Sequence, residues 1–153
     1  MSATAPPAPP TEEQVQEELV RLEAYSNQLN AVIQQHQILS ASRQDHVRAR
    51  ESLDGVDRAP ANAELLLPLG AEAFVRGSVD RASAVLVGIG SGVLVEMERP
   101  KVTELLADRL VRIDQAVHDL ENQMTTLDER IQILSRRLDA VARASASSDV
   151  GGD

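Results

Sequence analysis

The chain holds few side chains of the kinds that carry out chemistry, and none stands at a catalytic or metal-binding spacing. Among 153 residues there are three histidines and no cysteine. His36 and His46 are ten residues apart and His118 lies much farther along, so no i, i+4 pair presents two imidazoles to one ion. Without cysteine there is no disulfide, thiolate nucleophile or Cys-ligated metal. We therefore expect no catalytic residue, no metal site and no cofactor.

Three glycines, Gly88, Gly90 and Gly92, are the remaining candidates for a ligand site, as a phosphate-binding loop. Their spacing is G-x-G-x-G, no Lys-Ser/Thr pair follows, and the next segment has the alternation of a strand instead of a helix start. A hairpin turn explains them better, because glycine supplies positive φ and allows close approach of the backbone.

The charge of the chain excludes two classes of partner. There are 15 basic and 24 acidic residues, giving a formal charge of −9, which opposes binding to phosphate backbones and anionic lipids. The carboxylates, such as Glu17 and Glu18, are scattered at helix-surface spacings. The first residues lack a secretory signal pattern, and the most apolar stretch, residues 82–97, is too short and too glycine-rich to span a membrane. We expect a soluble, cytoplasmic protein without a nucleic acid or membrane partner.

A block of short strands occupies the middle of the chain, residues 65–98. Apolar residues there alternate with period two, as in Val85, Val87 and Ile89, and turn residues divide the block into four strands. The prediction is two β-hairpins. Because two-stranded sheets bury little and leave edges unpaired, we expect the block to pair with other chains. The residues predicted to make these subunit contacts are Leu67, Leu69, Phe74, Val75, Val79, Val85, Val87, Ile89, Val93 and Val95.

Helical patterns flank the strand block on both sides. Thr11 and Gln14 form a capping-box pattern at the start of the first helix, and Asp54-Gly55 is a stop signal. Pro100 fits the first turn of the second helix, whose apolar seam then recurs at spacings of three and four for five heptads. An antiparallel pair would bring together seam residues whose numbers sum to 156.

The predicted fold is α+β but mostly α, a long antiparallel coiled-coil hairpin joined by two β-hairpins. We divide the chain into a disordered proline-rich tail (residues 1–10), a first helix (11–54), a linker (55–64), the β-hairpins (65–98), a second helix (99–143) and a disordered tail (144–153).

The strand block and the start of the second helix resemble the prefoldin alpha-class family. LLLPLGAEAFVRGSV is similar to the family's Pro-Leu-Gly strand and turn, VLVGIGSGVLVEM is similar to its Gly-x-Gly-x-x-x-x-Glu hairpin, and the helix after Pro100 follows as expected. The resemblance in architecture covers residues 12 to 143. Two hairpins in place of one mark the alpha class.

The resemblance implies an ATP-independent holdase. Its implied assembly is an α2β4 hexamer, in which two alpha subunits and four beta subunits join their strands into an oligomeric β-barrel body. Its other implied partners are unfolded client proteins, held by the coiled-coil ends, and a group II chaperonin that receives them.

Apolar residues near the free helix ends are the candidate client-binding site, because terminal turns lack part of their hydrogen bonding and can adapt to many chains. These residues are Val15, Leu19, Leu22, Leu134, Leu138 and Val141. A competing interpretation makes them ordinary seam residues. The patterns alone also allow a coiled-coil scaffold or adaptor without chaperone activity, and an enzyme is a distant third possibility.

Overall fold

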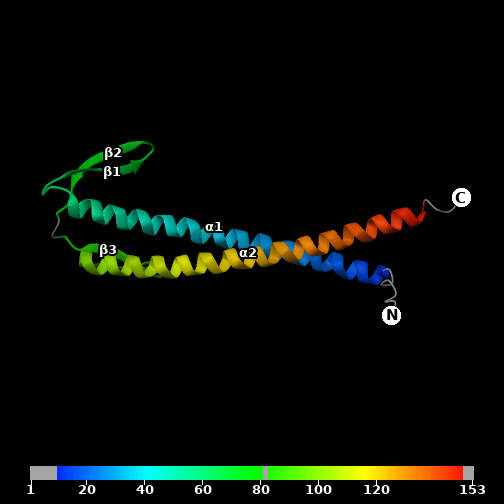
Figure 1. The fold of residues 1–153 in the computed structure, drawn as a ribbon. Helices are drawn as coiled ribbons and strands as arrows, with labels where there is room; N and C mark the ends of the chain where they lie inside the picture. The colour runs from blue at the N-terminus through cyan, green and yellow to red at the C-terminus, as the bar shows by residue number, and fades with distance from the viewer. Residues whose placement is uncertain (1–9, 81–82, 150–153) are drawn as a thin grey trace. The chain divides into compact units, whose positions relative to one another are not determined.

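The computed structural model describes residues 10–80 and 83–149. In chain order they form helix α1 (Glu12–Arg58), strands β1 (Glu64–Gly70), β2 (Ala73–Ser78), β3 (Val85–Gly90) and β4 (Val93–Met97), and helix α2 (Arg99–Asp149). The colours of Figure 1 show that the strands come between the two helices in chain order. The mostly helical α+β class with two antiparallel β-hairpins is therefore confirmed. The proposed disorder of residues 1–9 and 150–153 lies outside the described residues.

Contacts divide the chain into two compact units. We call the described residues up to Ile38, together with those from Val117 onward, the helical unit, and Leu39–Ala116 the hairpin unit.

The start of α1 carries the predicted cap. The Thr11 backbone N–H donates to Gln14 Oε1 at 3.0 Å, and the Gln14 N–H donates to Thr11 Oγ1 at 3.4 Å. This reciprocal pair satisfies two of the backbone donors that a helix start leaves open. Glu12 and Glu13 lie in the first turn, where the helix dipole favours negative charge.

The prediction that α1 ends at Asp54 is wrong, because the helix continues to Arg58. Glycine permits the left-handed conformation that ends helices but does not impose it, and inside a helix it costs only about 1 kcal/mol relative to alanine. Gly55 accepts a hydrogen bond from the Ala59 N–H at 3.0 Å, and Arg58 pairs with Asp54 at 3.7 Å. These contacts carry the helix through the glycine and shorten the linker.

Helix α2 likewise passes its predicted end at residue 143 and runs to Asp149. Pro100 lies in its first turn, as expected. The segment after Arg143 has two alanines, the residue with the highest helix propensity, among three serines, and it holds no glycine or proline before Gly151. Ser145 Oγ also donates to the Val141 and Ala142 carbonyls at 3.2 and 2.9 Å. Small residues therefore extend the helix here.

In the helical unit the two helices lie antiparallel in the predicted register. Arg137 Nη2 contacts Glu18 Oε1 at 3.0 Å, the Arg130 guanidinium lies 5.6 Å from the centre of the Tyr25 ring, and His36 Nε2 is 3.4 Å from Glu121 Oε1. These pairs sum to 155, 155 and 157, on either side of 156, whereas the neighbouring registers differ by a heptad. The seam residues Val32, Leu120, Leu127 and Leu134 are buried.

The two hairpins of the hairpin unit are built alike. Each is an antiparallel pair, and the register of β3 with β4 repeats that of β1 with β2 twenty residues later: Leu67 pairs with Val75, and Val87 pairs with Val95. Both registers shift just before the turn, at Gly70 and Gly90. These two glycines have φ of 98° and 119°, a region open to glycine alone among ordinary residues. Gly88, Gly90 and Gly92 thus belong to a hairpin and its turn, as expected.

Candidate functional site

The described residues contain no cluster of three or more His, Asp or Glu side chains that could hold a metal ion. His36 faces Glu121 across the helices, while His46 Nδ1 lies 2.7 Å from the Ser42 carbonyl of its own helix. His118 is 4.0 Å from Glu121. None of the described helices is long and apolar enough to cross a membrane. Exposed apolar side chains of the hairpins and helices are the candidate functional surfaces.

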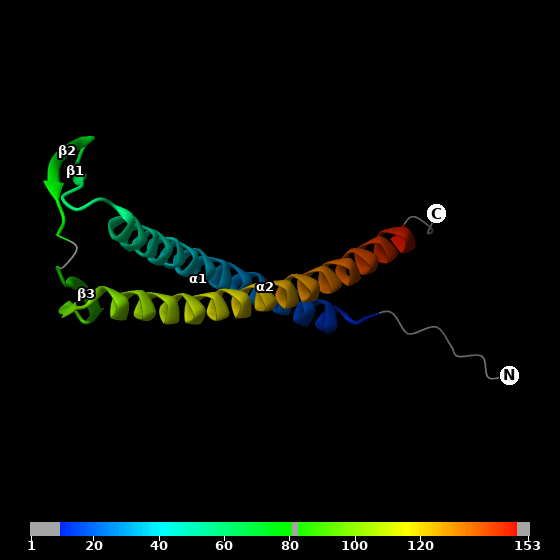
Figure 2. The same cartoon turned by 60° about the vertical axis from the view of Figure 1, so that its left-hand side comes forward.

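One face of the β3–β4 hairpin is covered by the chain's own helices. Val87 is 8 % exposed and forms a buried cluster with Val102 and Leu106 of α2, against which Val85 and Leu53 also pack. Figures 1 and 2 both show β3 beside the first turns of α2. Val85 and Val87 are predicted subunit contacts, and the structure packs both against the chain's own helices, with Val87 buried and Val85 partly buried.

The opposite face of the same hairpin is apolar and open. Leu86 and Leu94 are 64 % and 63 % exposed, and both lie on the face that points away from the helices, because successive strand residues alternate. Sequence reasoning missed these two residues. Their signal was the same period-two alternation, which shows that a strand has two faces without showing which one the helices cover. We call Leu86 and Leu94 the open face of β3–β4.

Both faces of the β1–β2 hairpin carry exposed apolar residues. Leu67 and Val75 form one cross-strand pair, and they occupy the positions that Val87 and Val95 hold twenty residues later. Leu66 and Phe74 lie on the other face. Every one of these four side chains is more than two fifths exposed. Of the other predicted contact residues, Val95 is partly buried, and four are exposed: Leu69, Val79, Ile89 and Val93.

The six predicted client-binding residues all belong to the helical unit. Leu134 is buried, Val15, Leu22, Leu138 and Val141 are partly buried, and Leu19 alone is exposed, at 44 %. Two other exposed apolar side chains belong to the same unit but were not predicted, Val20 and Ile133, at 57 % and 55 %. Both stand off the heptad seam, and a lone apolar residue at an outer helix position gives no sequence signal by itself.

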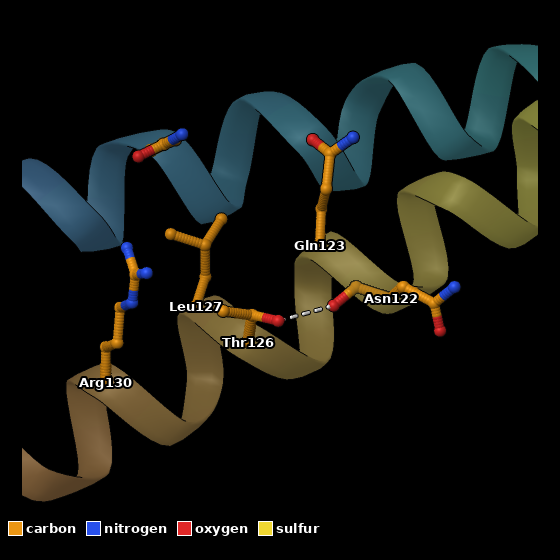
Figure 3. Close-up of a pocket in the computed structure, with 6 residues that line it drawn as sticks. Asn122, Gln123, Thr126, Leu127 and Arg130 are labelled. Carbon is orange, nitrogen blue, oxygen red and sulfur yellow. Dashed lines mark hydrogen bonds between the residues drawn. The ribbon is translucent and has the colours of Figure 1, made fainter.

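A shallow recess also opens beside the seam of the helical unit. It is lined by Gln28 of α1 and, on α2, by Asn122, Gln123, Thr126, Leu127 and Arg130, with a volume of about 260 Å³ (Figure 3). Thr126 Oγ1 donates to the Asn122 carbonyl at 3.0 Å within its own helix. The recess holds neither a carboxylate nor a histidine, so it offers no acid–base or metal chemistry.

Two long helices joined through two exposed β-hairpins define a class of mostly helical proteins with two small antiparallel sheets. The prefoldin family model, described as prefoldin subunit, matches residues 13–144. The chain belongs to the prefoldin family, and its relatives place it in the alpha class.

Two relatives illustrate the similarity in sequence. Prefoldin subunit alpha of Methanopyrus kandleri is 31 % identical over 117 residues, covering 74 % of this chain and 74 % of the relative. Prefoldin subunit alpha of Methanoculleus marisnigri is 28 % identical over 130 residues, covering 85 % of this chain and 87 % of the relative.

Two solved structures share the fold. Filamentous PFD from Methanocaldococcus jannaschii matches with a TM-score of 0.62 at 20 % identity, covering 75 % of this chain and 95 % of that one. The prefoldin beta subunit from Thermococcus strain KS-1 matches with a TM-score of 0.56 at 21 % identity, covering 87 % of this chain and 96 % of that one. The prefoldin family is a chaperone family, and membership of this family supports a cochaperone role for this chain.

Proposed function

We propose that this protein is the alpha-class subunit of an ATP-independent holdase, which captures unfolded proteins and delivers them to a group II chaperonin in the cytoplasm. The observation that carries the proposal is the set of apolar hairpin side chains left uncovered within the subunit, on a chain of a cochaperone family. Contiguous apolar faces left exposed on two-stranded sheets are typical of interaction surfaces.

The partners in assembly are prefoldin beta subunits and a second alpha subunit, in an α2β4 hexamer with a β-barrel body. The structure of each two-stranded hairpin supports assembly with other subunits. A two-stranded sheet is marginally stable in water, and both hairpins leave apolar residues and strand edges open that further strands can cover. One solved neighbour is a beta subunit, whose fold is similar to that of this chain with a TM-score of 0.56.

Client binding is assigned to the free ends of the two helices. The predicted residues of the heptad seam, Val15, Leu22, Leu138 and Val141, are only partly buried there, and Leu19 is exposed. Val20 and Ile133 add apolar surface outside the seam. Such a surface can accept many unfolded chains, because contact with apolar side chains is non-directional.

The test is suppression of aggregation. The purified complex of this chain with a beta-class subunit is mixed, without nucleotide, with an unrelated protein diluted from denaturant, and light scattering is followed over time. The proposal expects scattering to fall as the complex approaches a stoichiometric amount. A coiled-coil scaffold or adaptor, the alternative for this architecture, would leave the scattering curve unchanged at every ratio.

A further inference from the structure

The hairpin unit contains a charged side chain in an unusual place. Among the residues that the structure describes, Arg99 alone is a charged side chain that is buried, at 9 % exposure. Burying a charge is costly unless it is paired and hydrogen-bonded. A guanidinium at this position therefore needs fixed partners, and its contacts show what it holds together.

Arg99 joins three segments of the chain. It is the first residue of α2, and its Nη1 donates to Oδ1 of Asp57, in the last turn of α1, at 2.8 Å. Its Nη2 donates to the backbone carbonyl of Asp80, in the linker between the two hairpins, at 2.7 Å. The same carbonyl accepts the Ser83 N–H at 3.1 Å. One planar guanidinium thus links both helices and the inter-hairpin linker.

Local helix physics does not explain the two charges. A negative charge in the last turn of α1 and a positive charge at the start of α2 each oppose the dipole of their own helix. Only the ion pair between Asp57 and Arg99 makes the two charges favourable at these positions. This arrangement indicates that Asp57 and Arg99 serve the packing between elements and not the formation of either helix.

A second arginine of α2 holds the other part of the same hairpin. Arg109 Nη2 donates to the carbonyl of Gly88, in β3, at 2.8 Å. Between the two arginines lie Val102 and Leu106, which bury Val87. The β3–β4 hairpin is therefore fixed on α2 by an apolar cluster with a guanidinium contact at β3 and another at the linker that precedes it.

We propose that Arg99, Asp57 and the Asp80 carbonyl form a latch that positions the β-hairpins for assembly. The latch sets where the chain leaves α1, where the linker after β2 lies and where β3 meets α2. Arg99 is a positioning residue, because its hydrogen bonds go to segments of its own chain and it acts through the placement of the hairpins. Its effect on assembly rests on the proposed function, but the latch itself does not.

The first test compares Arg99→Lys and Asp57→Asn with Arg58→Lys as control. Lysine keeps the charge but cannot donate to two separated acceptors with a planar fork. Arg58 is a matched control, because it lies next to Asp57 in sequence and its side chain is 81 % exposed. With helix content unchanged by circular dichroism, both latch variants should assemble with beta subunits roughly tenfold more weakly, while the control should match the wild type.

The exchanged pair Asp57→Arg with Arg99→Asp separates positioning from simple stabilisation. It restores a link between the helices and places each charge favourably on its helix dipole, but an aspartate cannot donate to the Asp80 carbonyl. Thermal stability should recover. Assembly should stay weak, and backbone amides of β3 and β4 should exchange roughly tenfold faster than in the wild type, with the helical unit unaffected.

Normal assembly and normal exchange in Asp57→Asn and Arg99→Lys would overturn the latch. If Arg99→Lys fails to fold, Asp57→Asn decides the matter, because the Asp57 side chain is 49 % exposed and the asparagine Oδ1 can still accept a hydrogen bond from Arg99, so that only the charge of the pair is lost. Should the wild-type chain itself not assemble with beta subunits, the proposed function fails, whereas amide exchange in the isolated chain still tests the latch.

Discussion

Two glycines show how little a residue type says without its backbone conformation. Gly55 lies inside α1, and a methyl group added there would meet no atom within 4 Å. Gly90 also has open space around it, but its φ is +119°. Alanine fits the first position and is strained at the second. The same substitution should therefore have opposite effects at the two sites.

We expect Gly55→Ala to stabilise the protein by about 0.5–1 kcal/mol, because alanine loses less backbone entropy in a helix than glycine does. The measurement is the midpoint of chemical denaturation followed by circular dichroism. Gly90→Ala serves as the contrasting variant and should lower the midpoint, since an L-residue is strained at that φ. A lower midpoint in Gly55→Ala would mean that α1 ends at Asp54, as its sequence had suggested.

At the scale of the elements, the two β-hairpins differ in what covers them. The face of β3–β4 that contains Val87 packs on Val102 and Leu106, whereas the corresponding face of β1–β2 with Leu67 is exposed. Leu86 and Leu94 form the open face of β3–β4. The two faces of that one hairpin should respond differently to a polar substitution.

Leu94→Asn should leave the subunit folded but weaken assembly. A buried amide without a partner costs about 1–3 kcal/mol, which corresponds to a loss of affinity of roughly fivefold to 150-fold per contact. Val87→Asn should instead destabilise the subunit itself, because Val87 is already buried by α2. The readouts are the mass of the complex and the thermal midpoint of the isolated chain. Val111→Asn is the control, on an outer helix position that is 68 % exposed.

Unimpaired assembly of Leu94→Asn would remove the open face from the interface. If Val87→Asn assembled poorly while keeping the thermal midpoint of the wild type, Val87 would contact a partner subunit after all.

Much of this architecture could be predicted from the sequence, because its helices carry strong local signals. The heptad seam of α2 is strongly periodic, and its apolar residues are buried or partly buried, as the pattern predicts. The capping pair of Thr11 and Gln14 forms as predicted. The sequence could not predict which face of the β3–β4 hairpin is buried. Period-two alternation assigns Val87 and Leu86 to opposite faces, but only tertiary packing decides which face the helices cover.

The latch was likewise beyond sequence reasoning. Asp57 and Arg99 are separated by the whole strand block, and each looks like an ordinary surface charge in its own segment. Only the fold brings them within 2.8 Å. The correction at Gly55 is connected to it, since the extra turn of α1 is what carries Asp57 to Arg99.

At the scale of the whole molecule, client binding and subunit assembly should be separable. The exposed residues Leu19, Val20 and Ile133 belong to the helical unit, and the hairpin faces belong to the other. Replacing all three by serine should weaken suppression of client aggregation by roughly tenfold, because the apolar area available to the client falls. Assembly mass and helix content should not change.

Ile38→Ser provides the matched control, since Ile38 is an exposed apolar residue of the same unit, at 71 %, but lies away from the free helix ends in the sequence. Its holdase activity should equal that of the wild type. Full activity in the triple variant would move client binding off these residues, and an equal loss in the control would indicate that apolar surface anywhere on the helices suffices.

The most direct test of the central claim, that the hairpins join this chain to other prefoldin subunits, is the native mass of the complex formed when it is co-expressed with a beta-class subunit. The account predicts a single species containing two copies of this 16.5 kDa chain and four beta subunits, which Leu94→Asn dissociates. A mass of one isolated chain, or a ladder of self-assembled chains that excludes the beta subunit, would contradict it.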